Sequence, residues 1–433
     1  MMSYLSVNPY KGTRDFYPED KRIQNYLFQT MRKVVQSYGY EEYDAPLIED
    51  LSLYLAKSGE EIANEQTYTF IDRGGRKLAI RPEMTPSVSR MVARRRQELT
   101  YPLRLYSIPN LWRYERQQKG RFREHWQLNV DLFGLDSIQA DNEIINIADD
   151  IWQTFGAKRS MYQFKINSRK FIDYVLSQYL KLTKDQTLRI SKLIDRFNKM
   201  PITDFINQVD ELISDQQRSF SVPEKLIEII KTTDLMKLPK ALLDIDEIKP
   251  IKELLELNSS NITNMAFDGT IMRGFDYYTD IIFEVFDTNP DNNRSMMGGG
   301  RYDGLVGLFG VDPLPTVGFG LGDATLLNFM LGHGLLPEIT SGIQVYVVHV
   351  GQIWQKTRGI IKELRLLGIN VAEGNPDRKV SDQISIAVKK KIPYILVIGE
   401  EELKSGNFTL KNLASSKEVK NDIRNLARII LDK

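Results

Sequence analysis

Residues 124–134, EHWQLNVDLFG, alternate strictly between bulky apolar and polar side chains. Successive side chains of a strand point to opposite faces, so this pattern predicts a β-strand with one packed face and one polar face. The apolar face carries Trp126, Leu128, Val130 and Leu132. The polar face carries His125, Gln127, Asn129 and Asp131. The fold must therefore contain a two-faced sheet. From this strand alone, the polar face could equally be exposed to solvent, which is common in antiparallel sheets, or line a polar pocket.

The length of the chain limits its number of domains. A chain of 433 residues is too long for one ordinary core, so two or three domains are expected, and 42% apolar residues are enough to fill them. The 58 basic and 57 acidic residues exclude a uniformly basic surface. A nucleic-acid partner would therefore have to be bound by local basic patches.

The cysteine and histidine content limits metal and redox chemistry. The absence of cysteine excludes disulfides and thiolate zinc sites. The histidines, His125, His333 and His349, are too far apart in sequence to suggest a zinc cluster. No apolar run approaches the roughly 20 residues of a membrane span, and the N-terminal residues lack the order of a signal or transit peptide. We therefore expect a cytoplasmic protein with no membrane contact.

Helices and strands are expected on both sides of the alternating strand. Helical spacing of apolar residues begins at Pro18, and Gly39 suits the end of that helix. A strand ending at Pro46 is expected next. A further strand then precedes a helix that starts at Thr85, with its hydroxyl as the cap and Pro86 at the first helical position.

The second half of the chain changes character twice. From about residue 168 to 260 the pattern is helical, with few glycines, and predicts a helical insertion. Strand signals resume at residues 281–286, and MGGGRYDGL, residues 297–305, predicts a glycine-rich turn. Residues 315–331 predict a strand, a tight turn and a helix. Residues 343–433 alternate strands with helices and predict a separate α/β unit with a largely buried sheet.

A short basic loop precedes the alternating strand. Its cations surround Gly120 and are Arg116, Lys119, Arg121 and Arg123. Most charge runs are solvated surface. The functional alternative is a loop that holds the phosphates of a nucleotide or of a nucleic acid end. Before this loop, Arg113 and Glu115 alternate with aromatic residues, which is not typical of a solvated face.

Polar residues also gather at the mouth of another predicted strand. Residues 272–286, MRGFDYYTDIIFEVF, place Arg273, Asp276 and two tyrosines directly ahead of a buried-strand pattern. Such residues form either a turn or the floor of a pocket. Glu83 and Thr85 likewise have a purely structural alternative, because an acid and a hydroxyl at a helix start are good capping groups.

These segments together resemble a known family. In order along the chain, they are KGTRDFYPED, LAIRPEMTPSVSR, RYERQQKGRFREHWQLNVDLFG, RGFDYYTDIIFEVF and GGGRYDGLVGLFG. They are similar to the histidyl-tRNA synthetases of the class II aminoacyl-tRNA synthetases, and RGFDYYT is close to a histidine-specific signature within that class. The resemblance spans nearly the whole chain.

The resemblance implies an α+β catalytic core made of residues 1–167 and 261–335, with the class II antiparallel sheet flanked by helices. Residues 168–260 would form a helical insertion domain, and residues 343–433 an α/β anticodon-binding domain. It also implies a homodimer formed largely through the first helix and the strand ending at Pro46.

The resemblance further implies a reaction and its residues. Histidine and ATP form histidyl-adenylate with release of pyrophosphate, and the histidyl group then passes to the terminal adenosine of tRNA(His). A carboxylate that attacks an α-phosphate needs fixed cations where negative charge gathers. The catalytic positions are matched by Arg113 and Arg273. The histidine-binding positions are matched by Glu83, Thr85, Gln127, Asp131, Arg273, Tyr277 and Tyr278. The ATP-binding positions are matched by Arg113, Glu115, Arg121 and His125.

Mg²⁺ is expected to come with the ATP rather than to be held by the protein alone. In the family pattern, Glu83, Thr85 and Gln127 hold the amino and carboxylate end of histidine, and Asp131 and Tyr278 hydrogen-bond its imidazole nitrogens. A buried site that satisfies both ring nitrogens rejects analogues that lack them, because its own polar groups would be left unpaired.

One departure from the family concerns ATP. Class II synthetases usually end their third motif with an acid and an arginine that clamps ATP opposite Arg113. This chain has GLGDATLLNFM, with Asp323 as the acid and Ala324 where the arginine is expected. Three outcomes are open: another cation substitutes, with Arg301 and Arg294 the nearest in sequence, the ATP geometry differs, or activity is lost.

Two smaller departures concern His125, where the family more often has an aromatic residue, and Asp131, where glutamate is commoner. The main alternative function is a non-catalytic paralogue acting as a histidine-sensing regulatory subunit. Such paralogues generally lack the anticodon-binding domain and lose the histidine signature, so the enzyme is favoured. A nucleic-acid-binding module without catalysis fits the basic loop but leaves the pocket residues unexplained.

Overall fold

The computed structural model describes residues 5–55, 65–115, 120–272, 277–292 and 294–431. They divide into two compact units: the described parts of Met1–Asp15 with Gln24–Leu336, and of Phe16–Ile23 with Pro337–Lys433. No helix among the described residues combines the length and apolar character that a membrane crossing needs.

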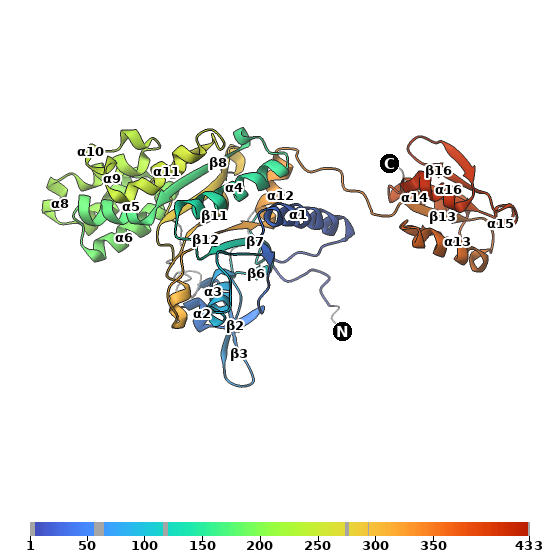
Figure 1. The fold of residues 1–433 in the computed structure, drawn as a ribbon, viewed down its shortest axis with the longest axis horizontal. Coiled ribbons are helices and arrows are strands. Elements are labelled where there is room, and N and C mark those ends of the chain that lie inside the picture. Colours follow the sequence, from blue (N-terminus) through green and yellow to red (C-terminus); the bar gives the residue numbers. More distant parts are fainter. Residues whose placement is uncertain (1–4, 56–64, 116–119, 273–276, 293, 432–433) are drawn as a thin grey trace. The chain divides into compact units, whose positions relative to one another are not determined.

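The first unit is built on a mostly antiparallel sheet (Figure 1). Its strands, in spatial order, are β1 (Glu41–Glu42), β5 (Leu103–Ser107), β7 (Glu124–Phe133), β12 (Thr316–Gly322), β11 (Ser295–Arg301), β10 (Ile281–Asp287), β8 (Tyr162–Ser168) and β9 (Met265–Phe267), with β6 (Asn110–Trp112) paired to β7. The β1–β5 and β8–β9 pairs are parallel. The predicted α+β fold with an antiparallel sheet flanked by helices is confirmed.

The apolar face of the sheet is covered by helices. They are α1 (Pro18–Ser37), α4 (Ile138–Thr154) and α12 (Asp323–Gly332). Leu128 and Val130 of β7 are fully buried in this core. Trp152 of α4 meets Phe329 of α12 with 4.9 Å between ring centroids, in an edge-to-face contact. The apolar residues of β7 are thus used for packing, which leaves its polar residues for the opposite face.

A small sheet lies at the edge of this unit. Its strands are β2 (Ile48–Asp50), β4 (Lys77–Ile80) and β3 (Tyr68–Ile71), and the helices α2 (Ser52–Leu55) and α3 (Thr85–Arg94) accompany them. Helix α3 carries a proline in its first turn, as predicted. Its N-cap is Met84, however, so Thr85 is the first helical residue and its hydroxyl does not cap the helix. Thr85 therefore lacks the structural role that capping would have given it.

Residues 169–258 are helical in the described structure, without a strand. Their α-helices are α5 (Arg169–Tyr174), α6 (Lys184–Asp195), α7 (Ile202–Leu212), α8 (Asp215–Ser219), α9 (Val222–Lys231), α10 (Lys240–Leu243) and α11 (Lys249–Asn258). A capping box at Thr183 and Gln186 begins α6, and another at Ser214 and Gln217 begins α8.

The second unit has its own five-stranded sheet. The order is β14 (Val371–Glu373), β13 (Val345–His349), β15 (Tyr394–Ile398), β16 (Phe408–Asn412) and β17 (Glu418–Asn421), with the first three parallel. Its α-helices are α13 (Trp354–Leu366), α14 (Val380–Lys389), α15 (Glu400–Ser405) and α16 (Ile423–Leu431). This confirms a separate α/β unit at the end of the chain.

Two further local predictions are wrong. Residues 297–301 belong to strand β11 rather than to a turn, because strands β10 and β12 supply hydrogen-bond partners on both sides. The strand expected to end at Pro46 is β1, which ends at Glu42. It is only two residues long and therefore contributes little pairing.

A buried ion pair ties β11 to α4. Nε of Arg301 donates to Oδ1 of Asp141 at 3.2 Å, and both side chains are almost fully buried. Burial raises the pKa of Asp141 to about 6, although the Arg301 guanidinium acts against this rise. Asp303 at 3.5 Å and the exposed Asp136 at 3.9 Å are more distant partners of Arg301. The guanidinium of Arg301 is therefore used for this ion pair in the core.

We expect Asp141→Ala to lower the free energy of unfolding by about 3 kcal/mol, because it leaves a buried guanidinium short of its main counter-charge. Urea unfolding followed by tryptophan fluorescence measures this change. Asp136→Ala is the matched control, and a change below about 0.5 kcal/mol is expected there because Asp136 is solvated. Equal stabilities of Asp141→Ala and the wild type would contradict the assigned role.

Candidate functional site

Glycines stand opposite every polar residue in the middle of β7. Gly318, Gly320 and Gly322 of β12 pair in register with Asp131, Asn129 and Gln127. A Cβ on Gly318 would lie 2.5 Å from Oδ1 of Asp131, and one on Gly320 would lie 2.0 Å from Nε2 of Gln127. These glycines therefore leave the space that the polar side chains of β7 occupy.

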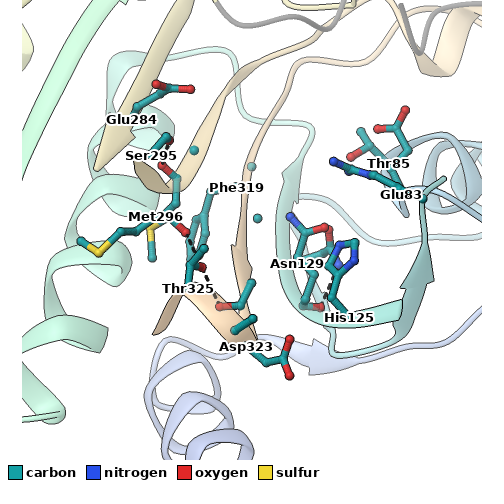
Figure 2. A pocket seen from close by; sticks show the side chains of 18 of the residues that line it. Glu83, Thr85, His125, Asn129, Glu284, Ser295, Met296, Phe319, Asp323 and Thr325 are labelled. Carbon is teal, nitrogen blue, oxygen red and sulfur yellow. Dashed lines mark hydrogen bonds between the residues drawn. The ribbon is translucent and has the colours of Figure 1, made fainter. Parts of the chain in front are cut away.

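The glycine row continues on β11. Gly298 and Gly300 pair with Gly320 and Gly318, and a Cβ on Gly300 would lie 2.9 Å from the ring of Tyr278. The result is an open pocket whose empty space, which includes the solvent at its mouth, is about 1170 Å³. Figure 2 shows Glu83 and Thr85 on one side of this pocket and Met296, Thr325 and Glu284 on the other. The sheet itself is the floor of the site.

One end of the pocket is lined by buried tyrosines and carboxylates. The hydroxyl of Tyr277 donates to Oε2 of Glu83 at 3.1 Å. The hydroxyl of Tyr302 donates to Oδ1 of Asp131. The ring centroids of Tyr277 and Tyr278 lie 4.9 Å apart, and those of Tyr277 and Tyr302 lie 5.5 Å apart. This end presents buried hydrogen-bonding groups and aromatic rings to a small polar ring.

The carboxylate of Asp131 can accept a hydrogen bond from a ligand. Burial raises its pKa to about 7, and the hydroxyl groups of Tyr302 and Tyr43 act in the opposite direction. Its second oxygen, Oδ2, is buried, and no described residue meets it in full hydrogen-bond geometry. An unsatisfied buried acceptor of this kind is costly, and it calls for an explanation in terms of function. A ligand N–H is the group that would satisfy it.

The other end of the pocket carries the cations. Nε of Arg113 donates to the carbonyl oxygen of Pro82 at 2.9 Å, which fixes the direction of the guanidinium. Oε1 of Glu115 lies 3.9 Å from Nη1 of Arg113, and its Oε2 lies 3.4 Å from Nη1 of the half-exposed Arg121. This end is suited to an anion such as a phosphate.

His125 stands at the cationic end as a neutral ring. Burial lowers its pKa to about 3, and the charges of Arg113, Arg14 and Arg121 lower it further. An uncharged imidazole presents a flat aromatic face beside the guanidinium groups. It can therefore stack against a base but cannot add to the positive charge of the site.

The structure brings most of the predicted residues together. The pocket is lined by Glu83, Thr85, Arg113, Glu115, Arg121, His125, Gln127, Asp131, Tyr277 and Tyr278. Arg273, predicted to be catalytic, lies outside the described residues, as do Arg116, Lys119 and Asp276. Arg123 does not line the pocket, because its guanidinium stacks 4.0 Å from the ring centre of Tyr114.

Sequence reasoning missed Tyr302 and Asn129 as pocket residues. The signal for Tyr302 was its spacing, because Gly298, Gly300 and Tyr302 follow one another at the period of a strand. The suggestion that Arg301 replaces the missing arginine is wrong, because Arg301 is bound to Asp141 in the core. Arg294 is not among the described residues that line the pocket.

The pocket offers few ligands for a metal ion. Glu115 and Glu284 are carboxylates that line it beyond the tyrosine-rich end. The described residues contain no group of three histidine, cysteine, aspartate or glutamate side chains placed to hold a metal. A Mg²⁺ ion bound here would therefore take most of its ligands from phosphate oxygens and water.

Two family models match the chain. The model described as histidyl-tRNA synthetase matches residues 12–326, and the model described as anticodon binding domain matches residues 344–433. The chain is 44% identical over 414 residues to a histidine–tRNA ligase of Leptospira biflexa, covering 95% of this chain and 94% of that protein. It is 34% identical over 422 residues to a histidine–tRNA ligase of Thermoplasma volcanium, covering 96% of each.

The fold also matches solved structures. A crystal structure of histidyl-tRNA synthetase from Nostoc sp. PCC 7120 superposes with a TM-score of 0.81 at 23% identity, covering 99% of this chain and all of that one. The likeness at this identity concerns the fold.

Replacing Asp131 tests the cost of its burial. The folded-state pKa of about 7 lies above the unfolded value of 3.8, so the carboxyl group contributes stability below about pH 4 that is lost as the pH rises through 7. We expect Asp131→Asn to raise the melting temperature relative to the wild type, and to raise it more at pH 8 than at pH 5. Thermal unfolding at both pH values measures the difference.

The exposed Asp312 provides the control, and Asp312→Asn should shift the melting temperature little at either pH. An Asp131→Asn shift that is the same at pH 5 and pH 8 would show that Asp131 ionises as easily in the folded protein as in the unfolded chain.

Proposed function

The chain belongs to the histidyl-tRNA synthetase family, and we propose that it ligates L-histidine to tRNA(His) in two steps through histidyl-adenylate, using ATP. The observation that carries this proposal is a single pocket with hydrogen-bonding groups for a small polar ring at one end and fixed cations at the other. The catalytic function is supported over a regulatory subunit, because relatives named as ligases match about 95% of the chain, including its anticodon-binding domain.

The first step joins the carboxylate of histidine to the α-phosphorus of ATP. A carboxylate oxygen forms the new P–O bond, and pyrophosphate leaves with the electron pair of the bond that breaks. Both reactants are anions, so the barrier falls when preorganised cations lie where the charge gathers. Arg113 provides one such cation, because its guanidinium is held by Pro82. We assign the same task to Arg273 on the family pattern.

Histidine is recognised at the tyrosine-rich end. Oδ2 of Asp131 accepts the N–H of the imidazole, and the hydroxyl of Tyr278 bonds to its other ring nitrogen. Asp131 is one methylene shorter than the glutamate that is commoner in the family, so the ring must approach β7 more closely. Glu83, Thr85 and Gln127 hold the amino and carboxylate groups of the substrate. A ring without both nitrogens would leave buried polar groups unpaired and would be rejected.

ATP occupies the cationic end. The neutral ring of His125 stacks against the adenine, and Arg121 with Arg113 faces the phosphates. Glu115 and Glu284 would hold Mg²⁺ together with the phosphate oxygens. The ion would draw negative charge from the departing pyrophosphate.

In the second step a hydroxyl of the terminal adenosine of tRNA(His) attacks the histidyl carbonyl carbon, and AMP leaves. Residues 343–433 bind the anticodon, which is supported by the family model that matches this part of the chain. We further propose that residues 168–260 form an insertion domain, that the enzyme is a homodimer, and that it acts in the cytoplasm. The absence of cysteine agrees with a reducing compartment.

Pyrophosphate exchange tests the first step. We expect the purified protein with Mg²⁺ to exchange labelled pyrophosphate into ATP only when histidine is present. Arg113→Ala should lower the exchange rate by roughly a hundredfold or more, because it removes one fixed charge from the phosphate site. Arg273→Ala should abolish exchange.

The control is Arg95→Ala, which removes an exposed arginine paired with Glu98 and should leave the exchange rate unchanged. If the folded wild type shows no histidine-dependent exchange, the regulatory subunit becomes the better explanation.

Filling the space beside Gln127 tests the pocket floor. A Cβ on Gly320 would lie 2.0 Å from Nε2 of Gln127, so the amide must move away in Gly320→Ala. We expect the KM for histidine to rise roughly tenfold or more, because the substrate loses its positioning. Steady-state exchange kinetics measure this, with thermal unfolding to check the fold.

Gly304→Ala is the matched control, because Gly304 is exposed and a Cβ there would contact nothing within 4 Å. If Gly320→Ala leaves the KM for histidine unchanged, Gln127 does not hold the amino acid.

A further inference from the structure

The segment Tyr10–Arg14, which we call the N-terminal strap, is bonded to the end of the basic loop. The carbonyl oxygen of Gly12 accepts the backbone N–H of Arg123 at 2.7 Å, and Nη1 of Arg123 donates to the hydroxyl of Tyr10 at 2.8 Å. Gly12 has a φ of +87°, and a Cβ there would lie 2.7 Å from Cγ of Arg123. The strap and the loop thus meet in a contact that only glycine permits.

Arg14 connects this loop to the opposite wall of the pocket. Its Nη2 lies 2.8 Å from Oδ2 of Asp323, the first residue of α12. Oδ1 of the same carboxylate accepts the backbone N–H of Trp126 at 3.0 Å. The guanidinium carbon of Arg14 lies 4.2 Å from the ring centre of Phe122. Phe122 and Asp323 both line the pocket, and Figure 2 shows Asp323 at its edge near His125.

The charge of Asp323 makes this contact consequential. Its carboxylate is 4% exposed and stands in the wall of a pocket that we assign to ATP, where an uncompensated negative charge would repel phosphate. Burial raises its pKa, and the charge and hydrogen bond of Arg14 lower it again. The neighbours of Asp323 along α12 that line the pocket, Ala324 and Thr325, carry no charge. Among the described residues, the cation paired with Asp323 is Arg14.

We propose that Arg14 is a positioning residue for the nucleotide end of the pocket, where it neutralises Asp323 and holds Phe122 beside the first residue of α12. The proposal rests on the assignment of this end to ATP. It concerns ATP and not histidine, because Arg14 contacts Asp323 and Phe122, whereas Asp131 at the end assigned to histidine is bonded to Tyr302.

The test is Arg14→Met, measured in pyrophosphate exchange with ATP and histidine varied separately. The KM for ATP should rise about tenfold, and the KM for histidine should stay within about twofold of the wild type. A residue with a merely structural role would move both KM values or neither. Arg104→Met is the matched control: Arg104 forms a half-buried bidentate pair with Glu143, away from the pocket lining, and neither KM should change.

Coupling to Asp323 supplies a second readout. In the double variant with Asp323→Asn, the repelling charge is gone, so the KM for ATP should be lower than in Arg14→Met alone. If the two substitutions act independently, Arg14 does not work through Asp323 and the proposal is overturned. Should Arg14→Met fail to fold, Arg14→Lys keeps the charge but loses the planar contact with Phe122, and a smaller rise in the same KM is expected.

The failure of this proposal can be told apart from failure of the proposed function. A wild type without histidine-dependent exchange removes the function on which the proposal rests, and the proposal with it. An active wild type with an Arg14→Met variant that keeps its KM for ATP overturns the role of Arg14 alone.

Discussion

The functional pocket depends on the absence of side chains from the middle of a sheet. Three glycines of β12 stand opposite the three central polar residues of β7, and two glycines of β11 extend the open surface. Any Cβ at Gly318 or Gly320 would lie within 2.5 Å of the side chains of Asp131 and Gln127. Glycine weakens a strand because it has no side chain to pack. Here that weakness is offset by the helices α4 and α12, which bury the apolar residues on the other face.

The pocket also contains buried carboxyl groups, whose burial lowers the stability of the fold. Asp131 is buried with one oxygen unsatisfied by the described residues, and Asp323 is buried beside the end assigned to phosphates. Both carboxyl groups have raised pKa values because of burial. Asp323 is paired with Arg14, as Asp141 is with Arg301 in the core, but Asp131 keeps an oxygen that the described residues leave unsatisfied. This difference marks Asp131 as a group that a ligand would bond.

The two ends of the pocket differ in how they are built. The end that we assign to histidine consists of side chains fixed by buried strands and by neighbouring aromatic rings, which suits a rigid and selective site. The end that we assign to the nucleotide is held by the N-terminal strap and by the ion pair between Arg14 and Asp323. Segments more than 300 residues apart in sequence therefore cooperate at one end of a single pocket.

The sequence alone determined the family and much of the site, because these follow from local pattern and side-chain chemistry. The alternation in residues 124–134 fixed the two faces of β7, and the motifs that resemble histidyl-tRNA synthetases gave both the family and ten described residues of the pocket. Tertiary structure decided the rest. Residues 297–301 became a strand because β10 and β12 offered partners, Arg301 was drawn into the core by Asp141, and Arg14 met Asp323 across the fold. These outcomes depend on which segments lie side by side, and spacing along the chain does not contain that information.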